Sequence, residues 1–262
     1  IIMTKLAING GAPSKDVKNS PWPAWPVWGK EEEKSLIEVL NSGVWSYNGP
    51  KEREFNKLFA EFTGTNYSIC TVNGTVTLQL ALEALGIGIG DEVILPGLTW
   101  QATAATIIDV NATPVMVDVC EDTWCIDPKK VQKAITPRTK AIIATHLYGN
   151  LCDIDELQKI AIKYNLALIE DAAEAIGSRY NGKTAGSMGT FGVFSFHGTK
   201  TITTGEGGML VTENEALFEK ITTLSNHGRV KGETKQFWPD ELGFKFKMSN
   251  IQAAIGYGQM LR

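Results

Sequence analysis

The stretch that decides the fold reads Phe191-Gly-Val-Phe-Ser-Phe-His-Gly-Thr-Lys200-Thr-Ile-Thr-Thr-Gly-Glu-Gly-Gly208, and Met209-Leu-Val-Thr212 follows it. Two short apolar runs flank a polar turn, a single lysine and a glycine-rich turn, which predicts strand, lysine loop and strand. A lysine between two buried strands is unusual, because lysine is almost never fully buried without a partner. Lys200 is therefore either a surface residue on a loop or a desolvated amine that attacks a carbonyl group.

Upstream of this stretch, short apolar runs alternate with helical patterns. With the two runs just quoted, the apolar runs predict about seven strands, at residues 67–72, 92–95, 114–117, 141–145, 166–169, 192–196 and 209–212. Helical patterns separate most of them, at residues 75–85, 101–109, 128–135 and 153–164. This alternation predicts an α/β fold with one mostly parallel sheet and helices on both faces. Because only the lysine loop separates the last two strands, one of them is expected to run antiparallel.

The two ends of the chain differ from this pattern. Prolines are dense in residues 1–29, which predicts an extended arm, and three tryptophans on it need a surface on the same subunit or a neighbour. Amphipathic helices at residues 30–42 and 51–63 open one large domain, predicted to span residues 30–240. Residues 228–239 form a basic loop. Residues 241–262, from Leu242 onward, are expected to open a final helix that leads to a small domain largely missing from this chain.

Composition excludes several classes of function. The chain has 262 residues, of which 43% are hydrophobic and 21% charged, and its net charge is −4, so neither nucleic acid nor an anionic membrane is an expected partner. No apolar run approaches the roughly 20 residues that a membrane span needs. The four cysteines lack the close pairs of a zinc site, which predicts reduced thiols, no metal and a cytoplasmic location.

In open parallel sheets, binding sites form at the carboxyl ends of the strands. After the first strand, Asn73–Leu78 is a glycine turn that opens a helix, which is a phosphate cradle unless Thr75 is simply the helix cap. This turn matches neither the dinucleotide fingerprint nor the Walker loop, so NAD and ATP are disfavoured. Trp100 follows the second strand and either covers a flat ring or packs in the core. His146 follows the fourth strand, as a polar wall of the site or as a core histidine.

A carboxylate and a hydroxyl stand at two further strand ends. Asp171 follows the fifth strand, where it either caps a helix or pairs with a protonated ring nitrogen, and Ser195 adds a hydroxyl to the phosphate cradle. Lys200 comes about thirty residues after Asp171, one strand later. Pyridoxal phosphate (PLP) requires all of these groups: an amine for its aldehyde, an acid for its ring nitrogen, a stacking ring and phosphate ligands. The combination predicts a PLP site.

These motifs resemble those of the DegT/StrS-type sugar aminotransferases, a family within the fold-type-I PLP enzymes. The resemblance covers nearly the whole chain and is carried by Asn73-Gly-Thr, Pro96-Gly-Leu-Thr-Trp-Gln-Ala-Thr, His146-Leu-Tyr-Gly, Glu170-Asp-Ala-Ala-Glu-Ala, Phe194-Ser-Phe-His-Gly-Thr-Lys and Thr204-Gly-Glu-Gly-Gly. It implies that residues 30–240 are a PLP-binding large domain, and that residues 241–262 begin the linker helix to a C-terminal small domain. Family members continue for roughly a hundred residues more.

The resemblance also implies roles for single residues. Lys200 and Asp171 would be catalytic: Lys200 forms the Schiff base with the cofactor and shuttles the proton, and Asp171 pairs with the ring nitrogen. Trp100 would stack on the ring, and the phosphate would be held by Gly74, Thr75 and Ser195. Glu174 stands near the ring hydroxyl, where the family often has Gln or His. Lys245 replaces an Asn that reaches the phosphate of a neighbouring subunit.

The implied function is transfer of an amino group from glutamate or glutamine to a keto sugar, expected to be nucleotide-linked, in amino-sugar, cell-surface polysaccharide or antibiotic biosynthesis. The resemblance implies a homodimer with shared active sites. Three alternatives remain: an aminotransferase for a keto-cyclitol such as scyllo-inosose, an enzyme similar to aminohydroxybenzoate synthase, and a PLP-binding fragment or pseudoenzyme without turnover.

Overall fold

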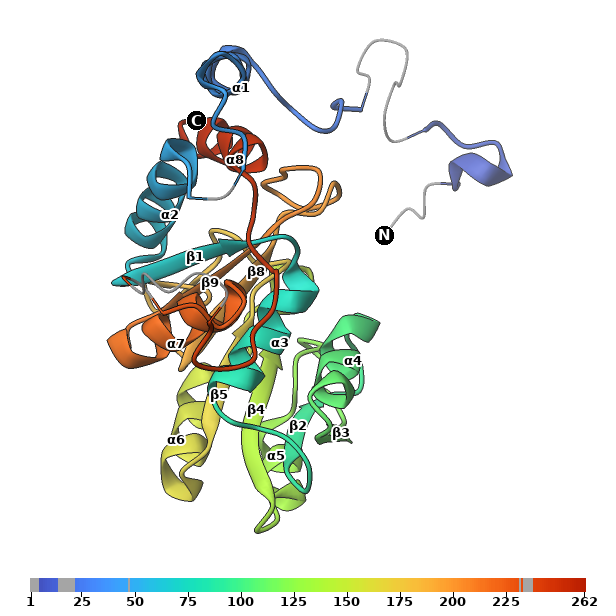
Figure 1. The fold of residues 1–262 in the computed structure, drawn as a ribbon. Coiled ribbons are helices and arrows are strands. Elements are labelled where there is room, and N and C mark those ends of the chain that lie inside the picture. Colours follow the sequence, from blue (N-terminus) through green and yellow to red (C-terminus); the bar gives the residue numbers. More distant parts are fainter. Residues whose placement is uncertain (1–4, 14–21, 47, 231, 233–237) are drawn as a thin grey trace.

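A computed structural model of the chain describes residues 5–13, 22–46, 48–230, 232 and 238–262 (Figure 1). Its centre is a seven-stranded sheet. The strands lie in the order β1 (Tyr67–Thr71), β9 (Gly208–Thr212), β8 (Phe191–Ser195), β5 (Ala167–Asp171), β4 (Thr139–Thr145), β2 (Glu92–Pro96) and β3 (Thr113–Val117). β9 runs antiparallel to β1 and β8, and the remaining pairs are parallel. This confirms the predicted α/β fold with a mostly parallel sheet.

Helices cover both faces of the sheet (Figure 1). One face packs against α3 (Gly74–Ala84), α4 (Gln101–Asp109) and α7 (Glu215–Ser225). The other packs against α2 (Pro50–Thr63), α5 (Pro128–Ala134), α6 (Ile154–Tyr164) and α8 (Asn250–Met260). Because successive strand residues point to opposite faces, Ile94 of β2 lies in one core cluster while its neighbours Val93 and Leu95 lie in another. Double-sided burial explains why the strands read as continuous apolar runs.

A small two-stranded ribbon was not anticipated. β6 (Arg179–Tyr180) pairs antiparallel with β7 (Lys183–Thr184), between β5 and β8 in the chain. Its turn consists of Asn181 and Gly182, whose φ angles are 49° and 83°. An Asn-Gly pair is a strong hairpin signal because both residues tolerate positive φ, so the sequence did contain the information.

The last helix begins later than the sequence pattern suggested. Instead of opening near Leu242, α8 starts at Asn250, because Ser249 caps it. The Ser249 hydroxyl accepts a hydrogen bond from the Gln252 N–H at 3.2 Å, and the Gln252 side chain accepts one from the Ser249 N–H at 3.2 Å. This reciprocal capping box satisfies two amides that have no acceptor within the helix. The preceding segment is not helical, and within it Phe244 and Phe246 stack with their ring centroids 4.7 Å apart.

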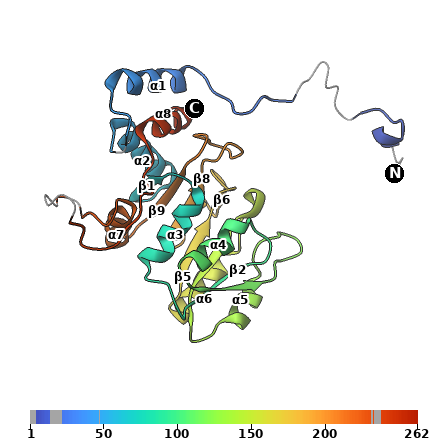
Figure 2. The same ribbon diagram turned by 45° about the vertical axis from the view of Figure 1, so that its right-hand side comes forward.

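The amino-terminal segment lies outside the sandwich of sheet and helices. α1 (Lys30–Ser42) packs beside α8, as both views show, while residues 5–13 lie away from the sheet and contain only the short 3-10 helix η1 (Ala7–Asn9) (Figures 1 and 2). Trp22 and Trp28 remain 71% and 70% exposed in the described part of the chain. Parts of the predicted arm and of the basic loop, at residues 1–4, 14–21, 231 and 233–237, are outside the described residues.

Within the described ranges, no helix has the length and apolar character needed to cross a bilayer.

Candidate active site

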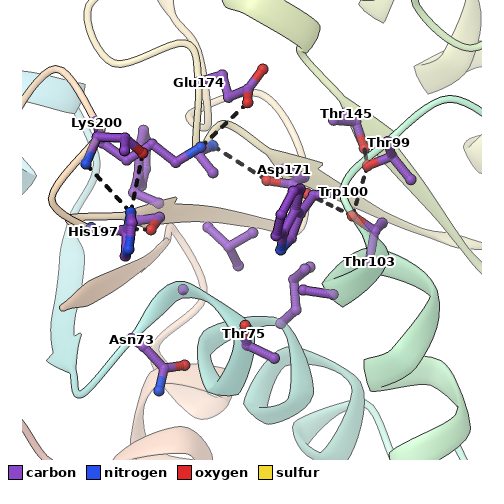
Figure 3. Close-up of a pocket in the computed structure, with 18 of the residues that line it drawn as sticks. Asn73, Thr75, Thr99, Trp100, Thr103, Thr145, Asp171, Glu174, His197 and Lys200 are labelled. Carbon is purple, nitrogen blue, oxygen red and sulfur yellow. Dashed lines mark hydrogen bonds and ion pairs between the residues drawn. The ribbon is translucent and has the colours of Figure 1, made fainter. Parts of the chain in front are cut away.

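A cavity of about 450 Å³ opens at the carboxyl ends of the parallel strands (Figure 3). Its volume is in the range of small-molecule sites. All seven residues that the sequence singled out for cofactor binding line this cavity: Gly74, Thr75, Trp100, Asp171, Glu174, Ser195 and Lys200. They come from four separate segments of the chain, and the sheet brings them together because its parallel strands end at one edge.

Asp171 is the last residue of β5 and is almost completely buried. One carboxylate oxygen accepts a hydrogen bond from the Thr103 hydroxyl at 3.1 Å, and the other accepts one from the Ala173 N–H at 3.3 Å. Burial raises the pKa of this carboxyl group, while the two hydrogen bonds and the positive charge of Lys200 act in the opposite direction. The segment after Asp171 is not a helix, so the helix-cap alternative does not apply.

Lys200 lies in the loop between β8 and β9, with its side chain only 20% exposed. The loop is held by backbone bonds, including the Lys200 N–H to the His197 carbonyl at 2.9 Å and the Phe196 N–H to the Gly207 carbonyl at 2.8 Å. The amine points into the cavity, where its Nζ lies 3.3 Å from Glu174 Oε1 and also faces Asp171 (Figure 3). Lys200 is therefore not a solvent-exposed loop residue.

The amino terminus of α3 closes one side of the cavity. Asn73, not Thr75, is the helix cap: its side-chain oxygen accepts the Val76 N–H at 3.0 Å. The N–H groups of Gly74 and Thr75 precede the first hydrogen bond within the helix, so they can donate to an anion. Gly74 is required by close packing, because a Cβ there would lie 2.8 Å from Ser195 Cβ. The helix end, the Thr75 hydroxyl and the Ser195 hydroxyl thus converge on one wall.

The sequence left open whether Trp100 and His146 lie at the site or in the core, and the structure gives a different answer for each. Trp100 precedes α4, is 78% exposed and lines the cavity, so it is not a core residue. His146 is fully buried beneath the site: its Nε2 bonds Glu170 at 2.9 Å, and its Nδ1 accepts the Cys152 N–H at 3.2 Å. Both ring nitrogens are satisfied, with the proton on Nε2, so His146 is a core histidine.

Sequence reasoning missed a row of hydroxyl groups behind Asp171. Thr99 bonds Thr103 at 2.8 Å and Thr145 at 3.2 Å, and Thr103 in turn bonds Asp171 (Figure 3). Thr99 lies just before α4 and Thr103 lies in its first turn, four residues later, a spacing that was readable from the sequence. That Thr103 meets Asp171 depends on the packing of α4 against the sheet, over β2 and β3.

Lys245 does not line the cavity: it forms an isolated backbone bridge with Asn226.

The chemistry of this cavity fits a phosphorylated pyridine aldehyde. The N–H groups of α3 and the hydroxyls beside them suit a phosphate, and Asp171 suits a protonated ring nitrogen. Lys200 lines the same cavity and offers an amine. Within the described part of the chain, no cluster of three or more His, Cys, Asp or Glu side chains is arranged to hold a metal ion.

Comparison with known proteins identifies relatives of the whole described core. The model of the DegT/DnrJ/EryC1/StrS aminotransferase family matches residues 26–262. An L-glutamine:2-deoxy-scyllo-inosose aminotransferase from Micromonospora echinospora is 43% identical, over 98% of this chain and 64% of its own length. GDP-perosamine synthase from Caulobacter vibrioides is 48% identical, over 88% of this chain and 62% of its own length.

A solved structure agrees with these two relatives. A Streptococcus pneumoniae protein assigned as a sugar aminotransferase, solved in its PLP form, superposes with a TM-score of 0.84 at 33% identity, over 90% of this chain and 65% of its own length. The present chain thus spans a little under two thirds of the length of each of these three proteins.

Proposed function

The chain belongs to the DegT/DnrJ/EryC1/StrS aminotransferase family, and from this premise we propose that it is a PLP-dependent aminotransferase. It would move an amino group from glutamate or glutamine to a keto group on a sugar or cyclitol. One observation carries the proposal: the Lys200 amine and the buried Asp171 carboxylate face the same cavity, beside the open amino terminus of α3.

When bound, PLP supplies a carbonyl carbon for a lysine amine and a ring that draws electrons away from the α-carbon of an amino acid. Lys200 is the candidate for this amine and, once released, for the base that takes the α-proton and then returns it. Glu174, 3.3 Å from Lys200 Nζ, pairs with the ammonium form and orients it towards the cavity. The side chains of Lys200 and Glu174 are both partly buried, which limits the access of water to this proton transfer.

Asp171 would hold the proton on the ring nitrogen. Burial alone raises the pKa of its carboxyl group, but a cationic partner in hydrogen-bond contact favours the ionised form. The Thr103 hydroxyl keeps one carboxylate oxygen in place, and Thr99, which is itself bonded to Thr145, holds Thr103 in turn. The carboxylate is therefore oriented before a ring arrives, which reduces the cost of reorganisation.

The other residues of the cavity would bind and orient. The N–H groups of Gly74 and Thr75, with the Thr75 and Ser195 hydroxyls, are suited to the phosphate, whose charge the α3 dipole favours. Trp100, exposed at the cavity wall, is suited to cover one face of the ring.

For the acceptor we propose a six-membered, polyhydroxylated keto ring. The names of the two relatives refer to 2-deoxy-scyllo-inosose, a keto-cyclitol, and to GDP-perosamine, a GDP-linked amino sugar. Their identities to this chain are similar, so a nucleotide-linked keto sugar and a keto-cyclitol are both candidates, with an aminohydroxybenzoate-type ring as a further outcome of the same test.

We further propose a homodimer that works in the cytoplasm. The exposed Trp22 and Trp28 support a second subunit, because large apolar side chains on an extended segment are stabilised by a covering surface. All four cysteines are free, and three of them are buried, which suits a reducing compartment.

The test combines cofactor trapping with nitrogen transfer. The purified chain is loaded with PLP and reduced with borohydride, and the modified peptide is located by mass spectrometry; Lys200→Ala is compared with the surface control Lys163→Ala. We expect the adduct on Lys200 in the parent and the control and none in Lys200→Ala. Equal trapping in Lys200→Ala would refute the assignment.

The second experiment measures transfer of ¹⁵N from labelled L-glutamine or L-glutamate to a panel of keto sugars and keto-cyclitols, which identifies the acceptor. Trapping of the cofactor without any transfer of ¹⁵N would indicate a PLP-binding pseudoenzyme.

A further inference from the structure

A second, smaller pocket adjoins the candidate active site. It has a volume of about 290 Å³ and is lined by residues 122–124 and 147–150. Leu147 lines this pocket and the larger cavity as well, so the two adjoin at this residue. A ligand that fills the larger cavity therefore lies beside the smaller one.

The smaller pocket is built from two loops that are bonded to each other. The Asn150 side-chain amide donates to the Thr123 carbonyl at 3.0 Å, and the Cys125 thiol donates to the Asn150 carbonyl at 3.4 Å. Across this junction Trp124 and Tyr148 make an edge-to-face contact with ring centroids 6.4 Å apart. Both rings are still largely exposed, at 53% and 76%. The pocket thus presents a pair of aromatic rings to solvent.

The backbone of both aromatic residues is strained. Trp124 has φ 59° and Tyr148 has φ 53°, in the left-handed region. Of the seven described non-glycine residues with positive φ, four are Asn, which tolerates this region well, whereas bulky aromatic residues do not. The strain does not serve to bury either ring, because both are exposed. Strain retained at exposed side chains beside a cavity points to a binding role for these side chains.

The pocket is also linked to the reacting amine. Glu174 accepts the Tyr148 N–H on Oε2 at 2.9 Å, and its other oxygen lies 3.3 Å from Lys200 Nζ. A single carboxylate therefore spans the distance between Lys200 and the Tyr148 loop (Figure 3 shows the Lys200 side). The smaller pocket is therefore joined through Glu174 to the part of the cavity where the Lys200 amine lies.

We propose that this pocket, formed by Trp124 and Tyr148 with Asp122 and Asn150, is the outer subsite for the amino acceptor. It takes the edge of a polyhydroxylated ring remote from the keto carbon, or the substituent on that edge. The aromatic rings contact its C–H groups, and Asp122 and Asn150 bond its hydroxyls. The proposal rests on the proposed aminotransferase function and specifies where the acceptor, as opposed to the donor, is recognised.

The test removes each ring without disturbing its backbone. Trp124→Asn and Tyr148→Asn place a residue that tolerates positive φ at each site, and Tyr164→Asn, at the far end of α6, is the control for loss of a surface aromatic ring. 2-Deoxy-scyllo-inosose and a GDP-linked 4-keto sugar are titrated by calorimetry onto each PLP-loaded protein. The donor step is followed separately, by the change in cofactor absorbance after addition of L-glutamine or L-glutamate.

We expect both ring-deletion variants to bind the preferred acceptor about tenfold more weakly, a loss of about 1.4 kcal/mol, with the donor step and the control unchanged. Where turnover is measured, KM for the acceptor rises while kcat changes little. Unchanged acceptor affinity in both variants overturns the subsite, as does an equal loss of donor and acceptor steps, which would indicate a structural role. Failure of the donor step in the parent protein counts against the proposed function alone, because the titration still tests the subsite.

Discussion

Glu170 and Asp171 are adjacent carboxylates at the end of β5, but they lie in two very different regions. Glu170 points into a closed cluster, where it accepts N–H bonds from Gly186, Met188 and Gly189 at 2.9, 2.6 and 2.6 Å, and a fourth bond from His146. Asp171 points into the open cavity and accepts two bonds, from Thr103 and Ala173. Neighbouring strand residues face opposite sides of the sheet, so one step along the chain separates the two regions.

The difference shows how a buried carboxylate can be assigned to structure or to chemistry. Four donors around Glu170 satisfy its lone pairs, and they tie β5 to β4 and to the loop before β8. Asp171 keeps capacity to accept a further bond from the cavity, and burial without full satisfaction raises its pKa. A satisfied carboxylate stabilises the fold, whereas an incompletely satisfied one beside a cavity is suited to a ligand. Three measurements on two variants test this comparison.

The largest expected effect is on catalysis at Asp171. Asp171→Asn keeps the shape of the side chain but removes the charge that holds a proton on a ring nitrogen, and we expect the donor step to slow by about 10³-fold. The rate is measured by stopped-flow absorbance of the PLP-loaded protein after mixing with L-glutamate. Asp155→Asn, on the surface of α6, is the control. A variant that keeps the parent rate would contradict the assigned role.

The next effect is on stability at Glu170. Glu170→Gln places an amide NH₂ against a set of N–H donors, so at least one buried donor loses its acceptor, and we expect a loss of about 3 kcal/mol in the free energy of unfolding. Urea unfolding of the chain measures it, with Glu156→Gln on α6 as the control. Borohydride trapping at Lys200 should persist in the folded variant. An unchanged urea midpoint would show that the hydrogen bonds to the Glu170 carboxylate do not stabilise the fold.

The smallest effect is a dependence of stability on pH without cofactor. The pKa of Asp171 is raised on folding, so between the unfolded value of about 3.9 and the folded value the native state binds more protons than the unfolded state. Stability therefore falls as pH rises through that window. Asp171→Asn lacks this loss, so its stability relative to the parent should increase from pH 4 to pH 7. Thermal unfolding at several pH values measures this, and a difference that grows on acidification would reverse the sign.

The succession of strands and helices along the chain was predicted well from the sequence. Strands that are buried on both faces appear as continuous apolar runs, which are easy to recognise. Its errors were local. The cap of α3 is Asn73 and not Thr75, α8 begins after Ser249, and the ribbon at Asn181-Gly182 was overlooked. Each of these depends on a few hydrogen bonds at an element boundary, where several nearby polar residues compete for the same backbone groups.

The order of residues along the chain alone determined that Lys200, Asp171, the turn at Gly74 and Trp100 come after strands that end at one edge of the sheet, since every crossover returns the chain to that edge. Only the tertiary structure decided which polar groups are satisfied. It buried His146 against Glu170, placed Thr103 on Asp171, and brought the loops of Trp124 and Tyr148 together beside the cavity. Periodicity along a strand or helix specifies a face, but contacts across elements depend on packing, which no local pattern encodes.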